Sequence, residues 1–373
     1  MMQNILTASE NYTELDEYFK STGTKKILLV CDNSIGFLKL NDYFNTLEER
    51  LSIKVIRFSD FEPNPKYESV VNGVELFHNE NCELIAVVGG GSAIDVAKCI
   101  KLYSNMDSSK NYLKQEIVPN DITLFAVPTT AGTGSEATRY AVIYYNGEKQ
   151  SVTSESCIPS TVLFDPSVLK TLPMYQKKAT MMDAFCHAIE SFWSVNSTDE
   201  SKQYSKEAIQ LILANIDSYL ANDETANANM LKAANIAGKA INITQTTAGH
   251  AMCYKLTSLF GIAHGHAAAL CDKVLFPYMI ANADKCIDKR GVQYLKDTFA
   301  EIAEATDSDS VVLAAEKFAG IVDRLEFAPP QIKSEIDIEV LKTSVNLVRL
   351  KNNPVSLSLN VIEKLYRNIL EVK

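Results

Sequence analysis

The sequence has no run of apolar residues as long as the roughly 18 that a membrane-spanning helix needs. Its first twelve residues, MMQNILTASENY, also lack the charged start and apolar stretch of a secretory signal peptide. We therefore expect no membrane partner and a cytoplasmic location.

Blocks of lysine and arginine are missing as well, and the net charge is -10 at pH 7. Binding to nucleic acid needs a basic face, so no nucleic-acid partner is expected. The 8 cysteines are scattered and form no C-x-x-C pair, which argues against a disulfide framework and against a thiolate zinc site. Hydrophobic residues make up 46% of the chain and charged residues 22%, the balance of an ordinary folded protein.

The first half of the chain alternates short β-branched runs with helical patterns. Strands are predicted at residues 26–31 (KILLVC), 53–58 (IKVIRF), 84–88 (LIAVV) and 123–128 (TLFAVP). This alternation is typical of a parallel sheet with helices on both faces, as in Rossmann-like domains.

After Pro173 the strand-like runs largely stop, and helical patterns such as KKATMMDAFCHAIESFW and SKEAIQLILANIDSYL follow. A chain of 373 residues is long enough for two domains. We predict an α/β dinucleotide-binding domain over residues 1–174 and an all-helical metal-binding domain over residues 175–373. A ligand cleft between them is the natural expectation.

Glycines mark the joint between the third predicted strand and the next helix, at Gly89, Gly90 and Gly91, followed by Ser92. Glycine lets a pyrophosphate approach the backbone, and a helix N-terminus offers it free N–H groups. The spacing is not the G-x-G-x-x-G fingerprint, and a tight turn capped by Ser92 explains the glycines almost as well.

A second loop with this character, VPTTAGTGSEAT, follows the fourth predicted strand and carries Thr129, Thr130 and Thr133. Because parallel sheets bind ligands at the carboxyl ends of their strands, the two loops together form a plausible dinucleotide cradle, although an ordinary Ser/Thr-rich loop is the alternative. Asp32, after the first strand, favours NAD(H) over NADP(H) because it would accept from a ribose hydroxyl and repel a 2'-phosphate. Its alternative role is a helix cap.

Histidine is scarce, yet three of the 5 histidines fall in one stretch, GHAMCYKLTSLFGIAHGHAAAL at residues 249–270. A helix between His250 and His264 would separate them by about 20 Å, so both reach one ion only if the chain bends back. Gly261 and Gly265 permit such a bend.

Upstream, Asp183 and His187 are four residues apart, which puts both on one face of a helix. One carboxylate and three imidazoles suit Fe(II) or Zn(II) with a position left open for substrate. From the residues alone, His266 competes with His264 for the last ligand position.

These motifs, taken in order, resemble those of the iron-containing (group III) alcohol dehydrogenases. The resemblance covers nearly the whole chain, through EPNP (62–65), GGGSAIDVAK, VPTTAGTGSEAT, FDPSVLKTLP, DAFCHAIES and GIAHGHA. It implies a dehydroquinate synthase-like architecture, NAD(P) dependence and a homodimer. It also implies the metal ligands Asp183, His187, His250 and His264. The cofactor contacts that it implies are Asp32, Asn64, Gly89, Gly90, Gly91, Ser92, Asp95, Thr129, Thr130, Thr133 and Lys149.

Two residues depart from the pattern of this family. Tyr254 stands where the family often has a second histidine, which is credited with proton relay, so Tyr254 is our candidate for that catalytic role. Met181 stands where the family usually has a glycine, and a bulkier side chain there would reshape the pocket.

With these departures the chain resembles a narrower branch, the phosphonoacetaldehyde reductases. A dianionic substrate needs cations, and Arg139, Lys255 and Arg349 are the candidates, with Lys351 nearby. The alternative for each is a solvated position or a salt bridge to a carboxylate.

The function expected is metal-dependent hydride transfer between a nicotinamide and a small aldehyde or primary alcohol, such as phosphonoacetaldehyde reduced to 2-hydroxyethylphosphonate. The main alternative is a dehydroquinate synthase-like cyclase or lyase that also uses NAD and a metal. It would use a glutamate ligand, whereas Asp183 and His187 favour the dehydrogenase. A metal-binding protein without turnover is a third interpretation.

Overall fold

The computed structural model describes residues 3–372, which divide into two compact units. The first unit contains the chain up to Leu172 together with Asn222–Leu231, and the second contains Pro173–Ala221 and residues 232 onward. The sequence predicts contiguous domains that meet after residue 174, whereas the structure adds a short helical segment to the first unit. Residues 1, 2 and 373, at the ends of the predicted ranges, lie outside the described residues.

The first unit is built on a six-stranded parallel sheet with the order β1-β8-β5-β4-β2-β3. Its strands are β1 (Asn4–Thr7), β2 (Lys26–Cys31), β3 (Lys54–Phe58), β4 (Leu84–Gly89), β5 (Thr123–Pro128) and β8 (Thr161–Phe164). The central strands β2, β4 and β5 are almost wholly buried, because helices cover both faces of the sheet. All four predicted strands are confirmed, and the α/β fold class with them.

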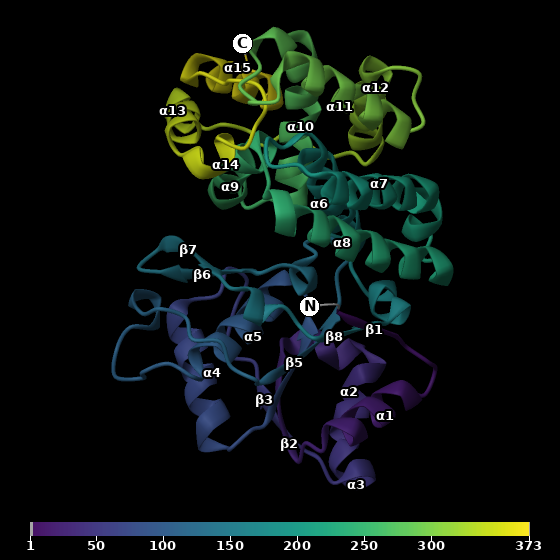
Figure 1. Cartoon of the computed structure of the whole chain (residues 1–373), viewed down its shortest axis with the longest axis vertical. Coiled ribbons are helices and arrows are strands. Elements are labelled where there is room, and N and C mark those ends of the chain that lie inside the picture. The colour runs from purple at the N-terminus through teal and green to yellow at the C-terminus, as the bar shows by residue number, and fades with distance from the viewer. Residues whose placement is uncertain (1–2, 373) are drawn as a thin grey trace. The chain divides into compact units, whose positions relative to one another are not determined.

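Helices α4 and α5 pack side by side against the sheet, and α1 and α2 lie on its other side (Figure 1). The α-helices of this unit are α1 (Thr13–Thr22), α2 (Lys39–Asn45), α3 (Leu47–Leu51), α4 (Tyr67–Asn79) and α5 (Gly91–Tyr103). Short 3-10 helices are η1 (Asn33–Phe37), η2 (Tyr112–Lys114), η3 (Ser135–Ala137), η4 (Glu155–Cys157) and η5 (Pro166–Lys170). The layered arrangement leaves the carboxyl ends of β4 and β5 at one edge of the sheet, next to each other.

A β-hairpin that the sequence analysis did not predict joins this unit, formed by β6 (Tyr140–Tyr145) and β7 (Glu148–Thr153). Its turn is Asn146–Gly147, and both residues have positive φ, 52° and 79°. An Asn-Gly pair between two β-rich runs is the strongest local signal for such a hairpin, and it was present in the sequence.

The second unit is helical, as predicted. Its helices are α6 (Met174–Trp193), α7 (Asp199–Leu220), most of α8 (Glu224–Thr244), α9 (Ala248–Phe260), α10 (His264–Ala281), η6 (Ala283–Lys285), α11 (Gly291–Ala305), α12 (Val311–Arg324), α13 (Glu335–Thr343), α14 (Leu347–Leu350) and α15 (Leu359–Ile369).

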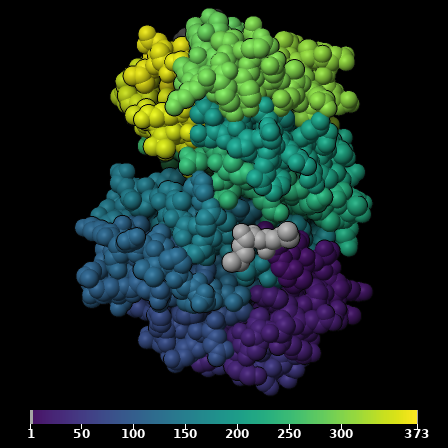
Figure 2. All heavy atoms as spheres, in the orientation of Figure 1, coloured from purple at the N-terminus to yellow at the C-terminus, as the bar shows by residue number. Residues whose placement is uncertain are grey.

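The core of this unit forms around α6 and α10, which contact each other along their length, and α9 packs on α10. In the space-filling view the C-terminal segment, in yellow, lies directly beside the green helices of the same unit (Figure 2). Within residues 3–372, no helix combines the length and the apolar character that crossing a bilayer requires.

Candidate metal centre and nucleotide loops

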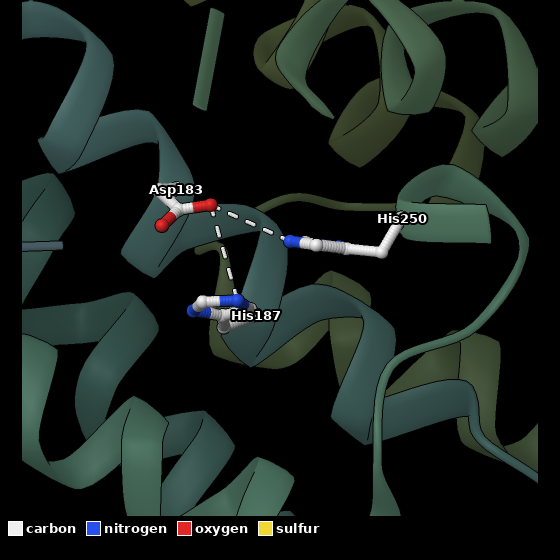
Figure 3. Close-up of side chains that lie close together, drawn as sticks. All are labelled: Asp183, His187 and His250. Carbon is white, nitrogen blue, oxygen red and sulfur yellow. Dashed lines mark hydrogen bonds and ion pairs between the residues drawn. The ribbon is translucent and has the colours of Figure 1, made fainter. Parts of the chain in front are cut away.

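Helix α6 supplies a carboxylate and an imidazole to one buried spot. Asp183 is 2% exposed and His187 is 5% exposed, although both are polar. The Nε2 atom of His187 lies 3.8 Å from Oδ1 of Asp183, as the four-residue spacing on a helix predicts. Figure 3 shows both side chains pointing toward the same point, which His250 approaches from α9.

The first turn of α9 brings His250 to this spot, with Nε2 3.4 Å from Oδ1 of Asp183. One ligand atom from each of Asp183, His187 and His250 lies within 4.8 Å of the others. Burial alone would raise the pKa of the Asp183 carboxyl, but the histidines around it hold that pKa below its ordinary value.

His264 is the first residue of α10, and its Nε2 atom lies 3.8 Å from the same Asp183 oxygen. Gly261 makes this placement possible, because it ends α9 with a φ of 69° and lets the chain turn back. Gly265 then allows close packing, since a Cβ there would stand only 1.9 Å from the carbonyl oxygen of Ala179 in α6. His264 is more open to solvent than the other three residues, with 36% of its side chain exposed.

The spacing of these atoms fits a divalent first-row metal ion. A tetrahedral ion with ligand bonds of about 2.1 Å separates its ligand atoms by about 3.4 Å. Each of the three imidazole nitrogens lies 3.4–3.8 Å from the Asp183 oxygen, close to this value. Among the described residues, the group whose ligand atoms all lie within 4.8 Å of one another is Asp183, His187 and His250, and His264 is not part of it. Three neutral nitrogens and one carboxylate oxygen are also the donor set that Fe(II) and Zn(II) accept.

Glu190, which the sequence analysis missed, orients one of the histidines. Its buried carboxylate accepts hydrogen bonds from Nδ1 of His250 and from the His250 backbone N–H, the latter at 3.0 Å. With the proton on Nδ1, the lone pair on Nε2 points toward Asp183 and is available to a metal. Glu190 lies three residues after His187 and seven after Asp183, on the same helix face, and this spacing was a usable signal.

Thr247 completes the support of Glu190 at the start of α9. Its backbone N–H and its hydroxyl both donate to Oε2 of Glu190, the hydroxyl at 2.7 Å. Nε1 of Trp193 donates to the same hydroxyl oxygen at 2.9 Å. These hydrogen bonds connect α6 to the start of α9 next to His250.

His266 takes no part in this centre. Its Nδ1 accepts from the hydroxyl of Tyr175 at 3.0 Å, and its Nε2 donates to the carbonyl oxygen of Ala328 at 3.1 Å. Its ring also stacks on Phe327, with centroids 4.5 Å apart. Because both nitrogens are occupied, the geometry favours His264 over His266 as the fourth metal ligand.

Tyr254, the candidate for proton relay, lies one turn after His250 on α9. Its ring stacks on His264 with centroids 5.6 Å apart and an angle of 15° between the planes. The side chain is half-buried. The stacking places Tyr254 next to the most open of the four candidate ligands, and the catalytic role of Tyr254 stays a prediction. Met181, the other departure, is fully buried in α6.

In the first unit, the two glycine- and threonine-rich loops contact each other at the carboxyl ends of β4 and β5. Gly90 is the N-cap of α5, and no side chain within residues 3–372 caps this helix, so the alternative of a Ser92 cap does not hold. A Cβ at Gly90 would stand 3.3 Å from Cγ2 of Thr130, and one at Gly91 would stand 2.9 Å from Cγ2 of Thr133. The first-turn N–H groups of α5 thus face the loop that carries Thr130 and Thr133, and helix N-termini of this kind are the usual place for a phosphate.

A Gly91→Ala variant is expected to bind NADH about tenfold more weakly, with little effect on the metal. The added methyl group would push on Thr133, whose Oγ1 accepts from the Ser135 backbone N–H at 3.2 Å. Gly36→Ala is the matched control, because a Cβ there meets nothing within 4 Å. Fluorescence titration with NADH measures the effect, and equal affinities in the two variants would contradict it.

The other predicted cofactor residues lie in the same unit, and several have partners of their own. Asp32 caps η1 by accepting from the Ser34 backbone N–H at 2.7 Å, so its cap role is realised. Asp95 accepts from the Ser135 hydroxyl at 2.7 Å and from the Val142 N–H at 3.0 Å, which holds the loop against the hairpin. The exposed Asn64 has a left-handed φ of 61°, and Lys149 lies on β7 near Asp95.

The three cationic residues that are candidates for binding an anionic substrate do not all lie in the same unit. Lys255 follows Tyr254 on α9, and Arg349 lies on α14, which packs against α9. Both therefore share the second unit with the candidate metal centre. Arg139 belongs to the first unit, and its guanidinium pairs with Glu155 at 2.7 Å, the salt bridge that was its alternative role.

Comparison with known proteins gives one family for both halves of the chain. Residues 3–166 match the family described as "Iron-containing alcohol dehydrogenase", and residues 177–370 match "Fe-containing alcohol dehydrogenase family, C-terminal". The 1,3-propanediol dehydrogenase of Citrobacter freundii is 33% identical over 326 residues, covering 83% of this chain and 80% of that protein. The NAD-dependent methanol dehydrogenase of Bacillus methanolicus is 29% identical over 96% of this chain and 95% of its own length.

Among solved structures, sulfoacetaldehyde reductase from Bifidobacterium kashiwanohense in complex with NAD+ superposes with a TM-score of 0.86 at 25% identity. The match covers 100% of this chain and 98% of that one. The predicted dehydroquinate synthase-like architecture is confirmed by neighbours of this kind. The chain therefore belongs to the iron-containing alcohol dehydrogenase family and is an oxidoreductase.

Proposed function

We propose that this protein transfers a hydride between NAD(H) and a small aldehyde or primary alcohol, with Fe(II) or Zn(II) held by Asp183, His187, His250 and His264. The observation that carries this proposal is the approach of three imidazole Nε2 atoms to one buried carboxylate oxygen. When bound, the ion supplies a Lewis acid that polarises the carbonyl of an aldehyde or lowers the pKa of an alcohol.

The side chains of this protein supply the remaining functions. Glu190 keeps the proton of His250 on Nδ1, which leaves Nε2 able to bind the ion. Tyr254 is proposed to pass the proton that aldehyde reduction consumes, because its phenol ring stacks on His264. In the first unit, the N-terminus of α5 and the threonine-rich loop are proposed to hold the pyrophosphate of the dinucleotide.

NAD(H) is proposed over NADP(H). Asp32 follows β2 at the carboxyl edge of the sheet, and its charge would repel a 2'-phosphate. Two of the similar proteins carry NAD in their descriptions, a methanol dehydrogenase and the sulfoacetaldehyde reductase complex.

For the substrate we propose an aldehyde that carries an anionic group, with phosphonoacetaldehyde as the leading candidate and 2-hydroxyethylphosphonate as its product. The guanidinium of Arg349, on α14, and the ammonium of Lys255, on α9, lie on or beside the helix that also carries His250 and Tyr254. A phosphonate matches the fork of an arginine. Sulfoacetaldehyde, named for one of the similar structures, is likewise an aldehyde with an anionic group.

Steady-state NADH oxidation tests the proposed function directly. The purified protein, stripped of metal and reloaded with Fe(II) or Zn(II), is assayed with phosphonoacetaldehyde, sulfoacetaldehyde and propionaldehyde, each with NADH and with NADPH. We expect metal-dependent oxidation of NADH that is fastest with an anionic aldehyde. Equal rates with and without metal, or no oxidation of the nicotinamide with any aldehyde, would contradict the proposal.

A further inference from the structure

Asp272 is a buried acid that faces the thiol of Cys186 and the carboxylate of Glu190. It lies in α10, eight residues after His264, and its side chain is fully buried. Among residues 3–372, no N–H or O–H group donates a hydrogen bond to either oxygen of its carboxyl group. A buried carboxylate without donors is strongly destabilising, so this group requires an explanation.

The explanation lies in its neighbour, the carboxylate of Glu190. A Cβ added to Gly249 would stand 2.0 Å from Oδ1 of Asp272 and 2.6 Å from Oε1 of Glu190, so the two acids meet at this glycine. The two acids fill the space that a side chain at position 249 would need, which accounts for the glycine there. Two carboxylates that meet in a buried site do not both stay ionised, and a proton held by one of them can form a hydrogen bond to the other.

The surrounding donors decide which of the two acids holds that proton. Glu190 already accepts from the backbone N–H groups and side chains of Thr247 and His250, which stabilise its ionised form. Asp272 faces only the weak donor of the Cys186 thiol, and burial followed by the charge of Glu190 raises its pKa well above the ordinary value. Asp272 is therefore the neutral acid and Glu190 the carboxylate that receives its O–H.

We propose that Asp272 is a positioning residue of the metal centre: its carboxyl O–H donates a hydrogen bond to Glu190 and fixes that carboxylate against His250. The chain of contacts runs from α10 through Glu190 on α6 to His250 on α9, so it connects the three helices that carry the candidate ligands. This inference rests on the ligand set proposed above. It assigns a function to an acid that touches neither metal nor substrate.

Two substitutions separate a hydrogen-bonding role from a role in packing. Asp272→Asn keeps the shape and retains an N–H donor toward Glu190, whereas Asp272→Leu fills a similar volume without any donor. The probe is Co(II) alone, with its dissociation constant measured by chelator competition and its visible absorption recorded for the geometry of the site. Thermal melting confirms that each variant is folded.

We expect Asp272→Leu to bind Co(II) at least about tenfold more weakly and to change the cobalt absorption, because loss of an outer partner of a histidine ligand typically costs 10- to 100-fold. Asp272→Asn is expected to stay within about threefold of the unmodified protein, with the same absorption. Equal Co(II) affinity and absorption in both variants, or equal losses in both, would overturn the proposal.

Infrared spectroscopy keeps the proposal testable if Asp272→Leu does not fold. The metal-free protein should show the carbonyl band of a neutral carboxylic acid at neutral pH, and Asp272→Asn should lose it. Absence of this band from the unmodified protein would overturn the proposal, and so would its persistence in the variant. A protein that shows the band but binds no Co(II) would instead refute the ligand set, so the two failures are distinguishable.

Discussion

Replacing His264 with alanine is expected to remove both the bound metal and turnover while the protein stays folded. His264 is the most exposed of the four candidate ligands, and its removal leaves no cavity in the core. Loss of a direct ligand should weaken metal binding by more than the 10- to 100-fold typical of outer partners, so turnover should fall by at least about a hundredfold. Metal content after gel filtration and NADH oxidation measure the two effects.

His266→Ala is the matched control, because it removes the same side chain two residues further along α10. This variant should keep its metal but melt at a lower temperature, since it loses the bonds to Tyr175 and Ala328 and the stacking on Phe327. The expected cost is about 2–4 kcal/mol. Full metal content in His264→Ala, or metal loss in His266→Ala alone, would show that the ligand assignment is wrong.

Replacing Arg349 with alanine is expected to raise the KM for phosphonoacetaldehyde by about 30- to 100-fold, because a charge-assisted contact to a dianion contributes about 2–3 kcal/mol. The KM for propionaldehyde should change by less than about threefold, since that substrate has no group for the guanidinium to bind. Steady-state kinetics with both aldehydes at saturating NADH measure the difference.

Two further variants control for charge and for the shape of the guanidinium. Lys351→Ala removes a cation from an exposed position near the same helix and should leave both KM values unchanged. Arg349→Lys should recover part of the lost affinity, because an ammonium keeps the charge but not the fork. A rise in KM that is equal for the anionic and the neutral aldehyde would remove the case for an anionic substrate.

Much of the sheet could be predicted, because the pattern that identifies each strand lies within the strand and its flanking residues. The four predicted strands are apolar runs bounded by turn residues, and burial on both faces makes such runs continuous in a parallel sheet. Strands β1 and β8 have only four residues each, too few for a pattern to emerge. The sequence analysis placed the segment Asn222–Leu231 in the predicted helical domain, whereas the structure groups it with the first unit. A helical pattern in the sequence does not indicate which unit the helix packs against.

Some features of the candidate site could likewise be predicted from local sequence, and others could not. The pair Asp183 and His187 follows from helix spacing, and the turn that returns His264 was foreseeable from Gly261. The choice of His264 over His266 needed the family resemblance, because two histidines in one helical turn differ only in what packs around them. Asp272 gave no sequence signal, since its meeting with Glu190 depends on the packing of three helices around Gly249.

The central claim is that one metal ion binds where these four side chains meet. Anomalous diffraction from crystals of the protein loaded with Zn(II) or Fe(II) tests it most directly. We expect a single strong peak within about 2.0–2.2 Å of Asp183, His187, His250 and His264. A peak at other residues, or no peak where the three imidazoles face the Asp183 carboxylate, would contradict the account.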